Sequence, residues 1–386
     1  MTPLRHREAR AARRAWASGD VEETARRAAE AGDDRLLILA DLVRGRFDRA
    51  LARYGTLAET GRFRVRALDE PVGHAWLHLD QVDRACEHLR RRGRRIPPDL
   101  ALRRDHPMTV EAAEPVTLAF QDHALAPYLP AVEGTLNGRR TLLHLDTGGR
   151  FLVMGTRRAT ETGIATLPNG RRFQGVTRTR ARIGTVRELG LGGATLTNVP
   201  VDVIPTLTGP QDIVIMGTSL LQRFLATIDT PAGRLLLTPR GHHAPLDGVR
   251  VPFCLWADHY MFARGGYGPR RDLTFFVDSG MVQLLEDEHG TLRQAGVLAT
   301  RSQYRSWGIP RAGLGTTHLK AVHPLRLGPL EQPGHLLSVA PARTVPWSRF
   351  GGITVDGLLS QAFFAPYAWT LDFDRFEYTF RPAKRP

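Results

Sequence analysis

The sequence predicts a mainly β protein with two similar lobes, preceded by an α-helical N-terminal region. Three observations predict this fold class. Residues 1–105 are rich in Ala, Leu, Arg and Glu, with the apolar spacing of helices. From about Val110 onward, short apolar runs alternate with Gly, Pro, Asn and Asp turns, as in strands joined by tight loops. Within that β region, three landmarks occur twice in the same order.

The helical region divides at turn-forming residues. The turns 18–20, 31–33 and Gly45 separate runs with helical spacing. The segment from Gly45 to Tyr54 resembles half of a tetratricopeptide-type helix pair, so the region is interpreted as a degenerate helical array that docks a protein partner or supports the rest. A simple helical cap is the alternative. Pro97-Pro98 and the following residues to Pro107 are interpreted as a linker. The expected helices are 3–18, 21–31, 34–43, 47–60, 65–68 continuing into 72–79, and 82–92.

The duplication is visible in the spacing of the landmarks. The run ending in Asp146-Thr147-Gly148 has its counterpart 132 residues later in Asp278-Ser279-Gly280. The runs 186–192 and 322–328 correspond at an offset of 136, and the segment 217–229 matches 360–372 at an offset of 143. An ordered set of three matches predicts two structural repeats of about 120 to 130 residues.

Each repeat places an apolar strand directly before Asp-Thr/Ser-Gly. The strand carries the carboxylate to a defined point, the hydroxyl hydrogen-bonds locally, and the glycine permits close approach of backbone. Two such loops related by a two-fold axis bring two carboxylates together. Like charges at contact distance cannot both ionise, so the pair shares a proton, with one member a general base and the other a general acid.

These motifs give the chain a family resemblance. Residues ~115–381, about 70% of the chain, resemble the pepsin and retropepsin clan of aspartic proteases, most closely the bacterial retropepsin-like group. The resemblance implies the bilobal acid-protease β-barrel fold and cleavage of peptide bonds. It implies the following site residues: Asp146 and Asp278 as the catalytic pair; Thr147, Gly148, Ser279 and Gly280 as support of the active loops; Gly170, Gly175, Val176, Gly313 and Gly315 in flaps over the substrate; and Gly217 and Ser360 as support behind the loops.

The predicted boundaries are a helical region at 1–105, a first protease lobe at 106–245 and a second at 246–386. Both lobes lie in one chain, so a monomer is the expected active unit. Two functions stay open: an active aspartic endopeptidase, and a weak or inactive peptide-binding protein with the same fold. Met281 after the second motif, and Ser360 in the place of Gly217, favour the second.

Composition bounds the location and partners. The chain has 386 residues, 42% of them hydrophobic and 24% charged, as in ordinary globular proteins. The sequence has neither a membrane-length apolar run nor the apolar core of a secretory signal. Cys86 and Cys254 are too few for a disulfide framework or a four-ligand zinc site. The net charge of +14 is dispersed, which does not favour nucleic acid as a partner. We therefore predict a cytoplasmic protein without metal or cofactor.

Overall fold

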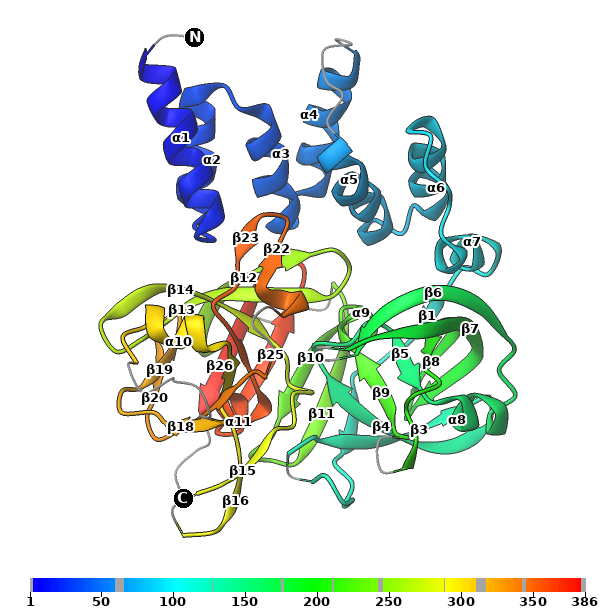
Figure 1. Cartoon of the computed structure of the whole chain (residues 1–386). Helices are drawn as coiled ribbons and strands as arrows, with labels where there is room; N and C mark the ends of the chain where they lie inside the picture. Colours follow the sequence, from blue (N-terminus) through cyan, green and yellow to red (C-terminus); the bar gives the residue numbers. More distant parts are fainter. Residues whose placement is uncertain are drawn as a thin grey trace.

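The computed structural model describes residues 3–59, 66–126, 128–174, 177–209, 212–241, 246–287, 289–309, 317–341 and 345–382. It has an α-helical N-terminal region followed by a region made mainly of β-strands, as the sequence predicts. In Figure 1 the helices form a row along one side of the molecule, and two β units stand beside each other beneath them.

The helical region keeps the predicted turns. Asp20 and Asp33 accept backbone hydrogen bonds at the starts of the second and third helices, and Gly32 ends the second in the left-handed region at φ 68°. Among the described helices, none is long and apolar enough to cross a membrane. The helices are α1 Pro3–Ala17, α2 Val21–Ala31, α3 Asp34–Val43, α4 Phe47–Glu59, α5 Arg66–His78, α6 Val82–Arg91 and α7 Pro98–Asp105.

The predicted linker is wrong at α7. Pro98 occupies the first turn of this helix, where a missing backbone N–H costs nothing and the fixed φ is already helical. A Pro-Pro pair was therefore a helix start rather than the beginning of an extended linker. The tetratricopeptide-like interpretation of the helices stays a prediction.

Six strands of the first β unit close into a barrel. Their order is β8-β5-β9-β4-β3-β7, and pairing of β7 with β8 closes the ring. Strand β6 extends β7 as a hairpin, β1 pairs with the outer part of β8, and the short helix α8 follows β5. The elements are β1 Thr109–Glu111, β3 Ala131–Leu136, β4 Arg139–Asp146, β5 Leu152–Met154, α8 Thr156–Glu161, β6 Thr166–Gln174, β7 Thr177–Leu191, β8 Ala194–Val203 and β9 Val214–Gly217.

The second β unit repeats the pairings of the first. Strand β14 runs parallel to β24 as β4 does to β9, β17 runs antiparallel to β24 as β5 does to β9, and β17 runs parallel to β21 as β5 does to β8. The elements are β13 Tyr260–Tyr267, β14 Arg270–Val277, β15 Leu284–Glu286, β16 Leu292–Gln294, β17 Val297–Ala299, α10 Arg301–Ser306, β18 His318–Lys320, β19 Leu325–Leu327, β20 Leu330–Gln332, β21 Leu336–Val339, η2 Pro346–Ser348, β22 Arg349–Phe350, β23 Ile353–Thr354 and β24 Gly357–Leu359.

An antiparallel sheet joins the two units. Its strand order β2-β11-β10-β25-β26-β12 interleaves strands from both ends of the β region. At its centre Thr227 pairs with Thr370, and their hydroxyl oxygens lie 2.7 Å apart. The strands and helices that complete it are β2 Val116–Ala119, α9 Thr218–Leu221, β10 Phe224–Asp229, β11 Arg234–Pro239, β12 Val249–Trp256, α11 Gln361–Phe364, β25 Tyr367–Asp372 and β26 Glu377–Pro382.

The helical region shares a hydrophobic core with the second unit. One cluster of buried side chains contains Trp16 and Ile38 from the helices together with Phe276, Phe350 and Leu358 from the strands. The Trp16 indole N–H also donates to the Gly351 carbonyl at 2.9 Å. This cluster lies on the outer face of β14. The side chains on the inner face of β14 belong to the other large cluster, which fills the barrel and the joining sheet.

The shared core predicts that helices and strands unfold together. Ile38→Ala removes a fully buried side chain and should cost about 2–5 kcal/mol of unfolding free energy. Leu4→Ala, at a side chain 66% exposed, is the control and should change it by less than about 0.5 kcal/mol. Denaturant titration followed by far-UV circular dichroism and tryptophan fluorescence measures both. A separate, earlier helical transition would contradict a common core.

Candidate active site

The two aspartates leave the core at equivalent places. Asp146 ends β4 and Asp278 follows β14 directly. The preceding Leu145 and Val277 are fully buried, and each strand lies between two neighbours of its own unit. Each carboxyl group is therefore carried on a central, immobilised strand and emerges where that strand stops.

Reciprocal hydrogen bonds fasten the two loops to each other. The Ser279 hydroxyl accepts from the Thr147 backbone N–H at 3.0 Å, and the Thr147 hydroxyl accepts from the Ser279 backbone N–H at 2.9 Å. The same hydroxyls donate to carbonyls of the opposite strand, Thr147 to Val277 at 3.2 Å and Ser279 to Leu145 at 3.4 Å. Both side chains are buried, so water does not compete for these bonds.

Each carboxyl group lies against the glycine of the opposite loop. A Cβ atom built on Gly148 would lie 2.5 Å from Cγ of Asp278, and one built on Gly280 would lie 2.0 Å from Cγ of Asp146. The backbone N–H of Gly148 donates to Asp146 Oδ1 at 2.7 Å, and that of Gly280 donates to Asp278 Oδ1 at 3.1 Å. Only glycine leaves room for the two carboxyl groups to approach.

The proximity of the carboxyl groups changes their ionisation. Burial and then the negative charge of Asp146 hold the pKa of Asp278 well above its usual range. Burial also raises the pKa of Asp146, but its hydrogen bond with Asp278 and the N–H of Gly148 oppose this rise. The pair therefore retains one proton at a pH where isolated aspartates have lost theirs.

The residues behind the loops differ between the units for a steric reason. A Cβ atom on Gly217 would lie 1.9 Å from the carbonyl oxygen of Arg150, so no side chain fits there. In the second unit the hydroxyl of Ser360, which is fully buried, donates to the carbonyl of Ala295 at 2.5 Å and accepts from the N–H of Ala362 at 3.1 Å. Ser360 is thus accommodated by its own hydrogen bonds.

Met281 begins a segment that has no equivalent in the first unit. Its side chain packs against the cluster shared with the helices, and its carbonyl accepts from Gln294 at 2.8 Å. Strands β15 and β16 form a hairpin between Met281 and β17. Gln294 also donates to the carbonyl of Tyr128, and the Tyr128 hydroxyl donates to Leu292 at 3.4 Å. The hairpin therefore ties the second active loop to the loop before β3.

The predicted flap residues are placed only in part. Strands β6 and β7 form a hairpin up to the pair Gln174 and Thr177, which is the form expected of a flap. Gly170 lies in this hairpin, exposed and at φ 74°, beside an irregularity in the pairing. Gly175, Val176, Gly313 and Gly315 lie outside the described residues.

The sequence did not predict the buried ionic network beside the loop of Asp146. The guanidinium of Arg150 lies 2.8 Å from Asp258, 3.2 Å from Asp99 and 3.5 Å from Asp202. Asp258 also accepts from His259 at 2.7 Å. These residues come from α7, β8 and the β12–β13 turn, so sequence spacing gave no signal. The one available clue was an arginine in a strongly apolar stretch directly after the motif.

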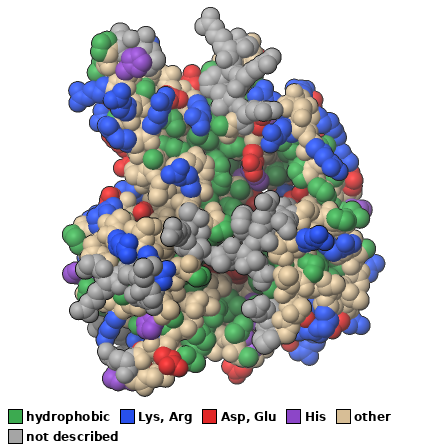
Figure 2. All heavy atoms as spheres, in the orientation of Figure 1, with side chains coloured by type: hydrophobic (Ala, Val, Ile, Leu, Met, Phe, Trp, Pro, Cys, Tyr) green, Lys and Arg blue, Asp and Glu red, His purple; other side chains and the backbone are tan. Residues whose placement is uncertain are grey.

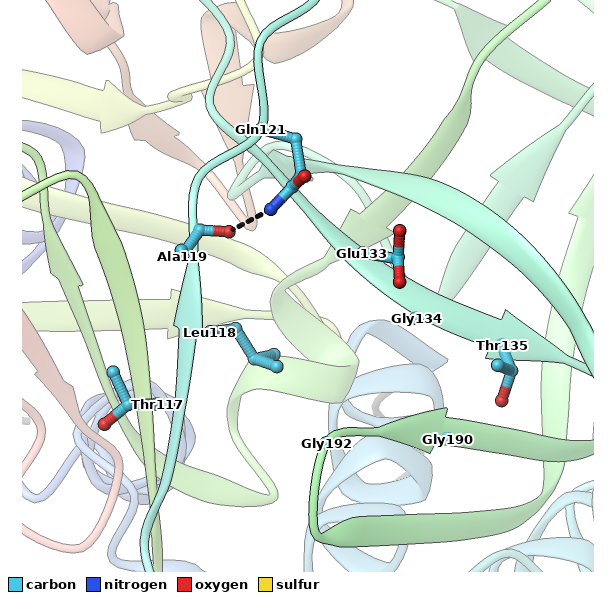
Figure 3. A pocket seen from close by; sticks show the side chains of 9 residues that line it. All are labelled: Thr117, Leu118, Ala119, Gln121, Glu133, Gly134, Thr135, Gly190 and Gly192. Atoms are coloured by element: carbon cyan, nitrogen blue, oxygen red, sulfur yellow. Dashed lines mark hydrogen bonds between the residues drawn. The ribbon is translucent and has the colours of Figure 1, made fainter.

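One cavity of the first unit is lined by residues other than those of the two Asp loops. A cavity of about 370 Å³ opens between β2, β3 and the β7–β8 turn, lined partly by backbone of Gly134, Gly190 and Gly192 (Figure 3). Glu133 is its one titratable lining residue. Within the described part of the chain, no group of three or more His, Cys, Asp or Glu side chains is arranged to hold a metal ion.

One comparison with known proteins matches the part of the chain that contains the first Asp loop. Residues 132–220 match the model of a family described as aspartyl protease, and this segment contains Asp146, Thr147 and Gly217. A similar solved structure is that of a retropepsin-like aspartic protease from Rickettsia conorii, at 19% identity and a TM-score of 0.26, with 34% of this chain and 93% of that chain covered. No curated protein matches the chain.

The steric difference between Gly217 and Ser360 is testable by exchanging them. Gly217→Ser places a side chain on the backbone of the first active loop and should cost about 3 kcal/mol or more of unfolding free energy. Ser360→Gly removes hydrogen bonds without any clash and should cost about 1–2 kcal/mol. Urea titration of both variants measures the difference, and equal costs would refute the steric explanation.

The raised pKa of Asp278 predicts a pH-dependent stability. The folded chain holds this proton more tightly than the unfolded chain, so the group lowers stability as the pH rises from about 4 towards its folded pKa. Asp278→Asn cannot ionise and should raise Tm near neutral pH, with the gain vanishing below about pH 4. A gain that is the same at all pH values would contradict this origin.

Asp272→Asn, at a position six residues before Asp278 and within β14, is the matched control. The guanidinium of Arg270 lowers the pKa of Asp272. The ionised, exposed carboxylate therefore stabilises the folded chain instead of destabilising it. This variant should leave Tm unchanged or slightly lower at neutral pH.

Proposed function

We propose that the protein is an aspartic endopeptidase that hydrolyses peptide bonds with Asp146 and Asp278. The observation that carries the proposal is the reciprocal bonding of Thr147 and Ser279, which fixes the two carboxyl groups against each other. Such rigidity is needed because a displacement of about 1 Å in a catalytic group can cost about a hundredfold in rate.

The chemistry follows from the single shared proton. The ionised carboxylate accepts a proton from a water molecule as the water oxygen bonds to the peptide carbonyl carbon. The protonated carboxyl group hydrogen-bonds the carbonyl oxygen as charge develops there. The C–N bond of the tetrahedral intermediate then breaks, and the leaving nitrogen takes up a proton from the Asp146–Asp278 pair. These steps need no covalent intermediate.

Four further observations support the proposal. The family match covers the first motif and its supporting glycine. The second unit has the same parallel pairing behind its aspartate. Ser360, which favoured an inactive protein from sequence alone, has hydrogen bonds that hold it in place. Met281, the other residue that favoured an inactive protein, packs against the core that the helices share with the second unit.

The surrounding elements suggest how substrate binds. We place an extended peptide between the two β units, with the β6–β7 hairpin as the first flap and Gly170 as one of its flexible points. Since both carboxyl groups come from one chain, a monomer is the proposed active unit. The helical region acts as a structural support of the second unit, because they share one core.

Replacing either aspartate tests the proposal directly. Asp146→Asn and Asp278→Asn should each lower kcat/KM for an unfolded protein substrate by at least about a thousandfold, since one proton can no longer be exchanged within the pair. Asp272→Asn is the control and should retain activity. Cleavage by both active-loop variants at the parental rate would overturn the assignment.

Binding separates the enzyme from a passive groove. A hydroxyl-bearing transition-state analogue should bind the parent and lose affinity at least tenfold in either variant, because the dyad is complementary to the tetrahedral state. Isothermal titration calorimetry measures this. Affinity unchanged in both variants, together with absent cleavage in the parent, indicates a peptide-binding protein instead.

A further inference from the structure

Two junctions connect the β units beside the Asp146–Asp278 pair. Each joins the segment before β3 or β13 of one unit to the segment after the Asp motif of the other. In one, Arg150 contacts Asp258 at 2.8 Å, with side chains 16% and 7% exposed. In the other, the β15–β16 hairpin contacts Tyr128. The repeated pairing of the units therefore places these junctions on opposite sides of the two carboxyl groups, and in Figure 1 the hairpin projects away from the row of helices.

One glutamine fastens the hairpin at both ends of its junction. The side-chain amide of Gln294 donates to the carbonyl of Met281 at 2.8 Å and to that of Tyr128 at 3.2 Å. Met281 is only three residues after Asp278, and its backbone N–H donates to the carbonyl of Asp278 at 3.2 Å. Gln294 thus bonds the second active loop and the first unit at the same time.

The loop that carries Tyr128 is close to the first aspartate. The carbonyl of Pro130 accepts from the backbone N–H of Leu145 at 2.8 Å, and Leu145 directly precedes Asp146. Tyr128 lies two residues before Pro130, a separation of about 7 Å at most even in an extended chain. The hairpin and Tyr128 are therefore linked to both Asp loops by short runs of backbone.

The register of the hairpin decides which side chains face the first unit. Leu284 pairs with Gln294, and Glu286 pairs with Leu292. Opposite residues of an antiparallel pair share one face, and so do residues two apart on one strand. Gln294 points towards the carbonyl of Tyr128, so Leu284 and Leu292 lie on that same face.

This face presents apolar side chains that the folded chain leaves partly uncovered. Leu292 is 52% exposed, and Leu284 and Tyr128 are half-buried. The Tyr128 hydroxyl donates to the carbonyl of Leu292 at 3.4 Å, which holds the phenol against β16. A leucine beside an aromatic ring gains free energy when a further apolar group removes their surface from water.

We propose that Leu284, Leu292 and the ring of Tyr128 form a subsite for an apolar side chain of the peptide substrate, and that Gln294 is a positioning residue that holds this subsite beside the carboxyl pair. This assignment rests on the proposed function. The short backbone links place the bound residue about two to four positions from the scissile bond, since an extended peptide advances about 3.3 Å per residue.

The subsite exists on one side only. Strand β5 begins six residues after Asp146, whereas β17 begins nineteen residues after Asp278, and the hairpin occupies the difference. At the other junction the ionic contact of Arg150 with Asp258 takes the place of an apolar surface. The preference for an apolar residue is therefore expected on one side of the cleaved bond.

The test is cleavage of a mixed peptide library by the full chain, with the cleaved bonds identified by mass spectrometry. The parent should favour apolar residues at one such position by about three- to tenfold, the value expected for burying about half of a leucine side chain. Leu292→Lys should replace this preference by one for acidic residues at the same position, which a general loss of structure cannot produce.

Two further variants complete the test. Arg293→Ser is the matched control, because Arg293 is exposed next to Leu292 but lies on the other face of the hairpin, and it should keep the parental preference. Gln294→Leu has neither donor and should weaken the preference at this position at least twofold. If Leu292→Lys does not fold, Leu292→Ser should lose the preference without gaining one for acidic residues.

The outcomes distinguish this inference from the proposed function. Cleavage by the parent without a positional preference overturns the subsite alone. The subsite is also overturned by a parental profile in folded Leu292→Lys, or by an equal change in Arg293→Ser. A parent that cleaves no peptide overturns the proposed function, and this inference with it.

Discussion

The structure of the site depends on the exchange of hydrogen bonds between Thr147 and Ser279. Two carboxyl groups that each tend to ionise would separate if they were free to do so, and these bonds prevent it. Each hydroxyl serves as acceptor for one backbone N–H and donor to one carbonyl, so both side chains are satisfied in a dry environment. The cost of a close carboxyl pair is met by bonds that water cannot replace.

The helical region is part of the same mechanical unit. It contributes Ile38 and Trp16 to a core that includes Phe276, two residues before Asp278. On the other side, Asp99 of α7 reaches Arg150, four residues after Asp146. Helices therefore contact both active loops through short chains of packed or paired side chains. In Figure 2 Lys and Arg side chains are spread over several parts of the face shown.

The sequence alone predicted the features of the fold that local sequence patterns determine. The helices, their caps and turns, and the strands before the two Asp motifs follow from periodicity and from glycine placement, and the offset of 132 residues linked the motifs before any contact was known. Helix α7 was mistaken because Pro-Pro marks both helix starts and linkers. The Arg150, Asp258 and His259 network was missed because its partners are separated by 108 residues and have no common motif.

The joining sheet sets an order of events for the chain. Strand β10 pairs with β25, and β26 lies between β25 and β12. The first unit and both aspartates are synthesised well before residues 367–382. Both Asp loops are therefore synthesised before the last strands of the sheet that joins the two units. A chain cut before residue 367 would thus keep both Asp loops and lose the two strands that lie between β10 and β12.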